Sequence, residues 1–192
     1  MEQYLILIIG WSIYFFIHSL LAGDRIKEYF ISLLGKHILY YRLMYNLLAT
    51  GGLFFLLFLN ASIPSKYILE PSSWTRYFSL VMATAGIFIL KAAFKQYSLG
   101  EFLGFRMDEQ EGFKAEGILK HIRHPLYSAT VLITIGFWLF TPNVTTLISA
   151  GCIFLYLAIG IPLEERKLIK RFGEPYREYR NRVPALIPRF KV

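Results

Sequence analysis

A basic and aromatic group of residues, Arg123, His124 and Tyr127, stands where a polar segment meets an apolar run that begins at Pro125. Proline is favourable at the first position of a helix, because its missing N–H would have no intrahelical partner there. A helix N-terminus carries free N–H groups and a partial positive charge, and the neighbouring guanidinium and imidazole add donors. This arrangement would suit a carboxylate or a phosphate. The competing interpretation is structural, since basic and aromatic residues commonly flank membrane spans.

Two acidic residues form a second candidate group, Glu164 and Glu165, which follow an apolar run that ends near Pro162. Carboxylates near membrane depth are costly unless they are paired or bind something. One of them could accept hydrogen bonds from ligand hydroxyls, and the neighbouring Arg166 could anchor an anionic substrate. The structural alternative is a pairing of Glu164 with Lys167, one turn along the same helix.

Polar side chains inside apolar runs form a third candidate group, which comprises His18, Arg42 and Asn46. Such groups usually face the interior of a helix bundle and are candidates for function. His18 could contact a substrate or only a neighbouring helix, and Arg42 lies near enough to the end of its run to extend toward the interface. No spacing typical of metal ligands occurs, and the one cysteine, Cys152, lies in an apolar run.

Apolar helices are the elements expected to position these residues. The chain has 192 residues, 55% of them hydrophobic, and a formal net charge of +8. This composition favours an integral membrane protein with one basic face over a nucleic-acid-binding protein. We predict a single all-α membrane domain, residues 1–192, with five transmembrane helices. The spans are expected at residues 4–22, 39–59, 74–94, 125–140 and 144–162.

Two shorter helices are expected outside the spans. The segment "DRIKEYFISLLGK", residues 24–36, mixes charges with regularly spaced apolar residues, which predicts an interfacial helix closed by Gly35. From Leu163 the chain turns polar and basic, and we predict a cytoplasmic C-terminal helix there, with a stop at Gly173. The first apolar run lacks a basic leading segment and a small-residue cleavage site, so we interpret it as a retained span.

The distribution of lysine and arginine predicts the orientation. These residues concentrate after the first span, after the third span and in the C-terminal tail, whereas the other connections are poor in them. Five spans place the three basic segments on one side, and an even number of spans would scatter them. Because basic loops stay in the cytoplasm, we predict an outer N-terminus, a cytoplasmic C-terminus and a site that faces the cytoplasm.

Several motifs carry a family resemblance when they are taken in order. "RHPLY" opens a span, and a helical hairpin, "EER" and "FGEPYREYRNRVPALIP" follow. Over roughly residues 97–190 this order resembles the isoprenylcysteine carboxyl methyltransferase and phospholipid methyltransferase superfamily of integral membrane proteins. "FIHSLLA", "YRLMYNLLA" and "EFLGFR" are similar to a bacterial branch of it. That branch includes nitrite- and nitric-oxide-reductase accessory membrane proteins and methanethiol S-methyltransferases.

The resemblance implies that S-adenosylmethionine binds in a cytoplasmic pocket built by the last spans, the preceding loop and the tail, and leaves as S-adenosylhomocysteine. The residues that match the cofactor-binding positions are Leu99, Gly100, Arg123, His124, Pro125, Tyr127, Glu164 and Glu165. Glu165 and Arg166 are the candidates for a catalytic role. His18, Arg42 and Asn46 are the candidates for binding the substrate.

The expected function is therefore methyl transfer from S-adenosylmethionine to a lipophilic acceptor, or to a small thiol or amine, in the bacterial inner membrane. The expected partners are a membrane lipid or a small molecule, with no nucleic acid and no metal. The alternative from another class is a non-catalytic membrane accessory protein of a respiratory reductase that keeps the methyltransferase fold. A small transporter is disfavoured, because the spans hold few charges.

Overall fold

The fold is all-α, as predicted. A computed structural model describes residues 2–35, 38–95 and 115–188, and within these ranges every regular element is a helix apart from an isolated bridge between Tyr67 and Asn143. The elements are α1 (Glu2–Leu21), α2 (Asp24–Leu34), α3 (Ile38–Ser62), α4 (Ser73–Phe94), η2 (Gly117–Lys120), α6 (Pro125–Phe140), α7 (Val144–Phe172) and α8 (Glu174–Arg182).

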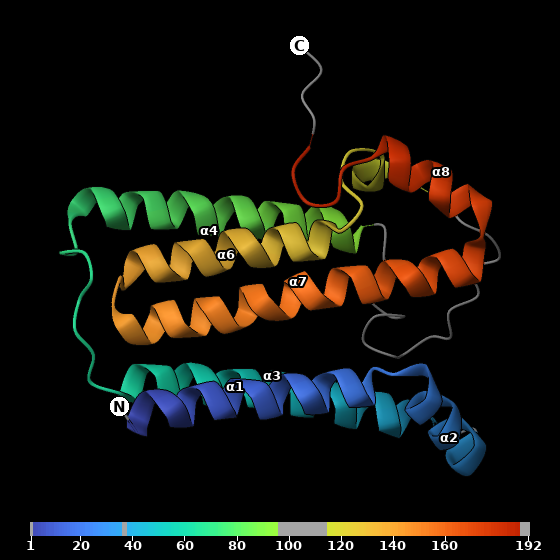
Figure 1. The fold of residues 1–192 in the computed structure, drawn as a ribbon, viewed down its shortest axis with the longest axis horizontal. Coiled ribbons are helices and arrows are strands. Elements are labelled where there is room, and N and C mark those ends of the chain that lie inside the picture. Colours follow the sequence, from blue (N-terminus) through green and yellow to red (C-terminus); the bar gives the residue numbers. More distant parts are fainter. Residues whose placement is uncertain (1, 36–37, 96–114, 189–192) are drawn as a thin grey trace.

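The five long helices lie side by side. Helices α4, α6 and α7 form one group, and the pair α1 and α3 packs beside α7 (Figure 1). Helices α2 and α8 gather at the end of the bundle where α6 begins and α7 finishes (Figure 1). The described parts of the three basic segments thus lie at one end. That this end faces the cytoplasm stays a prediction.

Four of the five predicted spans are long and apolar enough to cross a membrane, namely α1, α3, α4 and α7. Helix α6 is apolar but has only 16 residues. At about 1.5 Å per residue it is about 24 Å long, somewhat less than the ~30 Å hydrocarbon core. The count of five spans therefore stays a prediction, with α6 as the short member.

The sequence predicts a fifth span that ends at Pro162 and a separate C-terminal helix after it. The structure instead has one continuous helix, α7, which includes the basic stretch after Leu163. The change from apolar to polar residues marks a change of surroundings and not a helix end. The helix stops at the predicted Gly173, whose φ of 64° suits glycine and whose N–H donates to the Ile169 carbonyl. Glu164 and Glu165 therefore belong to the same continuous helix as the apolar span.

A buried polar network joins α1, α3 and α7. Trp11 Nε1 donates to Ser149 Oγ at 2.9 Å, and that hydroxyl donates to Asn60 Oδ1 at 2.8 Å. Asn60 Nδ2 in turn donates to Thr146 Oγ1 at 3.3 Å. Hydrogen bonds between membrane helices contribute about 0.6–2 kcal/mol each. The network fixes the α1–α3 pair against the first turns of α7, at the end away from α8.

Glycine allows α4 and α6 to approach closely, and this contact yields a first prediction. A Cβ at Gly136 would lie 2.8 Å from the Ser79 carbonyl oxygen and 3.0 Å from the Ala83 backbone nitrogen. Gly136→Ala is expected to lower the free energy of unfolding by about 1–3 kcal/mol, because backbone cannot yield as a side chain can. Chemical denaturation in detergent micelles measures this. Gly151→Ala is the control, since a Cβ there meets no atom within 4 Å.

Candidate functional site

Glu165 is the centre of a buried cluster of charges. Its Oε1 accepts from Arg123 Nε at 3.0 Å and Nη2 at 2.6 Å, and lies 3.1 Å from His124 Nε2. Its Oε2 lies 3.3 Å from Arg180 Nε. Glu165 is only 7% exposed, so the bases around it supply the compensation that a buried carboxylate requires. The cluster joins the start of α6 to α7 and α8.

The C-terminal tail crosses the start of α6. The backbone N–H of Arg123 donates to the Pro184 carbonyl at 2.9 Å, and that of His124 donates to the Ala185 carbonyl at 3.0 Å. The backbone N–H groups of the two residues that precede α6 therefore hold the tail.

Side chains reinforce the attachment of this tail. Arg123 Nη1 donates to the Arg180 carbonyl at 2.8 Å and also to the Val183 carbonyl. Ser128 Oγ donates to the Leu186 carbonyl at 2.7 Å. The Arg123 guanidinium therefore satisfies one carboxylate and two carbonyls at once, which fixes its position.

His124 links the charged cluster to two residues predicted for the site. It precedes the first residue of α6 and is 5% exposed. Its ring stacks on Tyr127, with centroids 5.4 Å apart and planes at 21°, and its Nδ1 lies 3.8 Å from Glu164 Oε2. A movement of Glu165 would therefore reach Tyr127 and Glu164 through this imidazole.

Tyr176 of α8 is buried close enough to the cluster to feel its charges. It is 2% exposed, and burial, with a further contribution from the Glu165 carboxylate, raises the pKa of its hydroxyl to about 12. The hydroxyl therefore stays protonated at neutral pH. Its neighbour Tyr179 is also buried and donates from its hydroxyl to the Leu119 carbonyl at 2.7 Å, which attaches α8 to η2.

A cavity of about 440 Å³ lies next to the cluster, between the end of α1, the start of α6 and the middle of α7. This size falls in the range of small-molecule sites. Its lining residues are Ser19, Ala22, Tyr127, Tyr156, Ile159, Gly160, Leu163, Glu164 and Lys167.

The lining offers complementary chemistry to a ligand. Glu164 Oε2 is buried and has no hydrogen-bond partner within the described part of the chain. Lys167 lies one turn further along α7, and Tyr156 and Tyr127 add aromatic rings. At Gly160 a Cβ would meet no atom within 4 Å, so its absence leaves the cavity open. A zwitterionic ligand with an aromatic group suits this combination of a carboxylate, an ammonium and two rings.

The structure divides the residues predicted from the sequence. Tyr127 and Glu164 line the cavity, whereas Arg123 and His124 both bind Glu165, and none of these three lines it. Pro125 is buried at the first turn of α6, and Arg166 is exposed on α7; neither is in the lining. Leu99 and Gly100 lie outside the described residues.

Three lining residues with polar side chains were not predicted for the site: Ser19, Tyr156 and Lys167. A signal for two of them was present. Residues 156, 160, 164 and 167 follow the spacing of one helix face, so extending the helical period from Glu164 in both directions would have found Tyr156 and Lys167.

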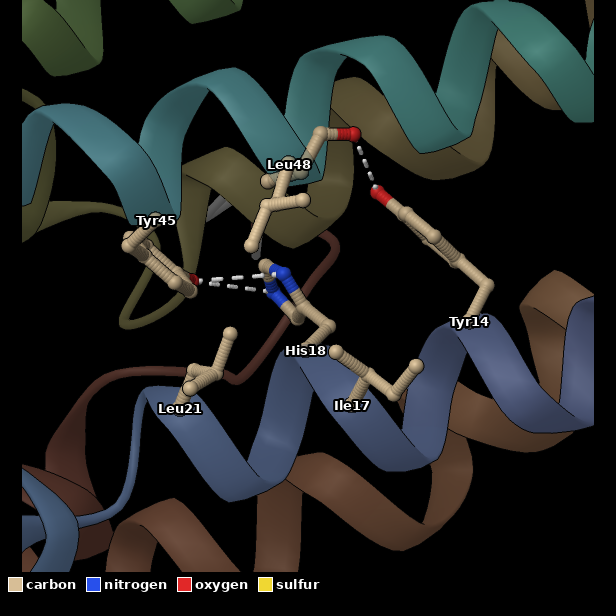
Figure 2. Close-up of a pocket in the computed structure, with 7 residues that line it drawn as sticks. Tyr14, Ile17, His18, Leu21, Tyr45 and Leu48 are labelled. Carbon is tan, nitrogen blue, oxygen red and sulfur yellow. Dashed lines mark hydrogen bonds between the residues drawn. The ribbon is translucent and has the colours of Figure 1, made fainter.

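His18 lies in a separate pocket, between α1 and α3. Its ring nitrogen Nδ1 is 3.2 Å from the Tyr45 hydroxyl, and Tyr14, Ile17 and Leu48 surround the pair (Figure 2). Tyr45 was not predicted for the site. The other two residues predicted with His18, namely Arg42 and Asn46, belong to α3 but do not line this pocket.

The sequence is similar to a known protein family and to several named enzymes. A family model described as "NnrU protein" matches residues 6–188. Methanethiol S-methyltransferase 1 of Bradyrhizobium diazoefficiens is 41% identical over 78 residues, which are 40% of this chain and 26% of that protein. Protein-S-isoprenylcysteine O-methyltransferase B of Arabidopsis thaliana is 30% identical over 118 residues, 60% of each chain. The predicted resemblance to this superfamily is confirmed.

The aligned parts are partial in every one of these relatives. Methanethiol S-methyltransferase 2 of Bradyrhizobium diazoefficiens, 39% identical over 92 residues, is covered over 34% of its length, and 46% of this chain takes part. The chain thus spans between about a quarter and 60% of the relatives named here. No solved structure matches the chain.

Proposed function

Since the chain belongs to the NnrU protein family, which it matches over residues 6–188, we propose that it is a membrane methyltransferase with S-adenosylmethionine as its methyl donor. The observation that carries the proposal is the cavity in which Tyr127 and Glu164 lie beside Lys167. Relatives named as methyltransferases support the same class of reaction.

The lining residues fit the parts of this donor. When bound, S-adenosylmethionine supplies a methyl group on a positively charged sulfur. In our proposal the buried Oε2 of Glu164 accepts from the ammonium or the ribose hydroxyls, and Lys167 binds the carboxylate. The rings of Tyr127 and Tyr156 flank the adenine.

We assign the charged cluster a positioning role. Methyl transfer from a sulfonium is an in-line displacement, which requires alignment and exclusion of water more than proton transfer. Glu165, proposed from the resemblance as a catalytic residue, holds Arg123 and His124 and does not line the cavity. In the proposal it keeps Tyr127 and Glu164 in place through His124.

Binding of S-adenosylhomocysteine tests the proposal. Isothermal titration calorimetry on the full chain in nanodiscs is expected to show one site. Glu164→Gln is expected to weaken binding about tenfold, the effect of losing one charged hydrogen bond. The control is Glu174→Gln, because that side chain is 69% exposed on α8 and does not line the cavity.

Transfer of radiolabelled methyl from S-adenosylmethionine to lipophilic and thiol acceptors then tests turnover. A wild-type chain that binds neither the donor nor its product would contradict the proposal. That result would favour the alternative, a non-catalytic accessory protein with the same fold.

A further inference from the structure

A second large cavity, an apolar groove of about 450 Å³, runs between α1 and α3. Ile13, Leu47 and Phe55 border it and are 54%, 74% and 62% exposed, so the groove opens on the outer surface of two candidate spans. Gly51 contributes no side chain, and a Cβ there would meet no atom within 4 Å. The groove is thus open toward the hydrocarbon of a membrane.

The groove has one polar end. Tyr14, Ile17 and Leu48 line both the groove and the small pocket of Figure 2, so the two are adjacent. The small pocket contains the His18–Tyr45 pair. An apolar groove with an imidazole and a phenol beside one end matches a molecule with an apolar chain and a hydrogen-bonding head group.

This polar end lies close to the proposed cofactor cavity. Ser19, the next residue after His18, lines that cavity and hydrogen bonds with the Tyr156 hydroxyl at 3.0 Å. The Tyr156 ring also contacts the His18 ring edge to face, with centroids 6.2 Å apart. One side chain therefore contacts both sites.

We propose that the groove between α1 and α3 binds the apolar chain of the methyl acceptor and that His18 and Tyr45 hold its head group. The acceptor is accordingly a lipophilic molecule taken from the bilayer and not a small free thiol. A small thiol would have no use for an apolar groove that leads to this pair. The identification of the ligand as the acceptor rests on the proposed function, whereas the binding of an apolar chain does not.

Photolabelling shows directly where the apolar chain of a bound ligand lies. The probe is a hexadecanol that bears a diazirine on its alkyl chain, applied to the full protein in nanodiscs, with labelled peptides identified by mass spectrometry. Labels are expected on α1 and α3 along the groove. Gly51→Leu is expected to reduce this labelling about tenfold, because a leucine side chain would fill the groove. Gly151→Leu is the matched control, an exposed glycine of α7 with equal space around it.

Competition tests the head group. Unlabelled hexadecanol is expected to displace the probe and hexadecane is not, and Tyr45→Phe is expected to remove this difference.

The proposal is overturned if labels fall equally on the outer face of α4, if Gly51→Leu labels like wild type, or if hexadecane competes as well as hexadecanol. S-adenosylhomocysteine binding, measured on Gly51→Leu and wild type, is expected to be equal. A wild type that does not bind S-adenosylhomocysteine would refute the proposed function. The labelling pattern would still show whether the groove binds an apolar chain.

Discussion

Glu165→Ala is expected to lower the free energy of unfolding by about 3 kcal/mol, because it leaves buried basic groups without their counter-charge. Arg123 and His124 both lose a partner on one carboxylate, and Arg180 loses its ion pair. Chemical denaturation in detergent micelles, followed by tryptophan fluorescence, measures the change. The same variant is expected to weaken S-adenosylhomocysteine binding, since His124 would no longer hold Tyr127 and Glu164 in place.

An exposed carboxylate of the same region supplies the control. Glu174 pairs with Arg177 at 3.6 Å, and both side chains are more than half exposed. Exposed pairs contribute little, so Glu174→Ala is expected to cost less than about 0.5 kcal/mol. Equal stability of the two variants would contradict the central role of Glu165.

Hydrogen exchange separates positioning from a general loss of stability. In Glu165→Ala the amides of Arg123 and His124, which bind the tail carbonyls, are expected to exchange faster, while those in the middle of α4 keep their protection. Uniformly faster exchange would indicate a merely destabilised fold and would argue against local positioning.

The helices could be predicted from the sequence because their signals are local. Apolar runs, Pro125 at a helix start and Gly173 at a helix stop act within a few residues. The prediction failed where the composition changes but the conformation does not. The polar residues after Pro162 looked like a new element, yet backbone hydrogen bonding continues α7 to Phe172.

The site was harder to predict because its contacts are not local. The motifs drew attention to Arg123 and Glu165, but residue types do not show whether two opposite charges bind a ligand or each other. The structure places these two together across 42 positions of the chain. Their neighbours Tyr127 and Glu164, one helical position or one turn away, face the cavity instead.

The second large effect is expected from a residue that carries no functional group. Gly160→Leu is expected to weaken S-adenosylhomocysteine binding about 100-fold, or roughly 2.7 kcal/mol, because its side chain would occupy the cavity. A Cβ at this position meets nothing within 4 Å, and leucine favours helix over glycine, so the fold is expected to persist. Calorimetry measures binding, and circular dichroism checks the helix content.

Two comparisons make this prediction specific to the cavity. Gly151→Leu changes another glycine of α7 with open space around it, outside the lining, and is expected to bind like wild type. Gly160→Ala adds one methyl group and is expected to fall between wild type and Gly160→Leu. Wild-type affinity in Gly160→Leu would show that the ligand does not occupy this cavity, whatever the chain transfers. If affinity falls stepwise from wild type through Gly160→Ala to Gly160→Leu, the free volume beside α7 helps to determine where the cofactor binds. The charged motifs would then not be the only determinant.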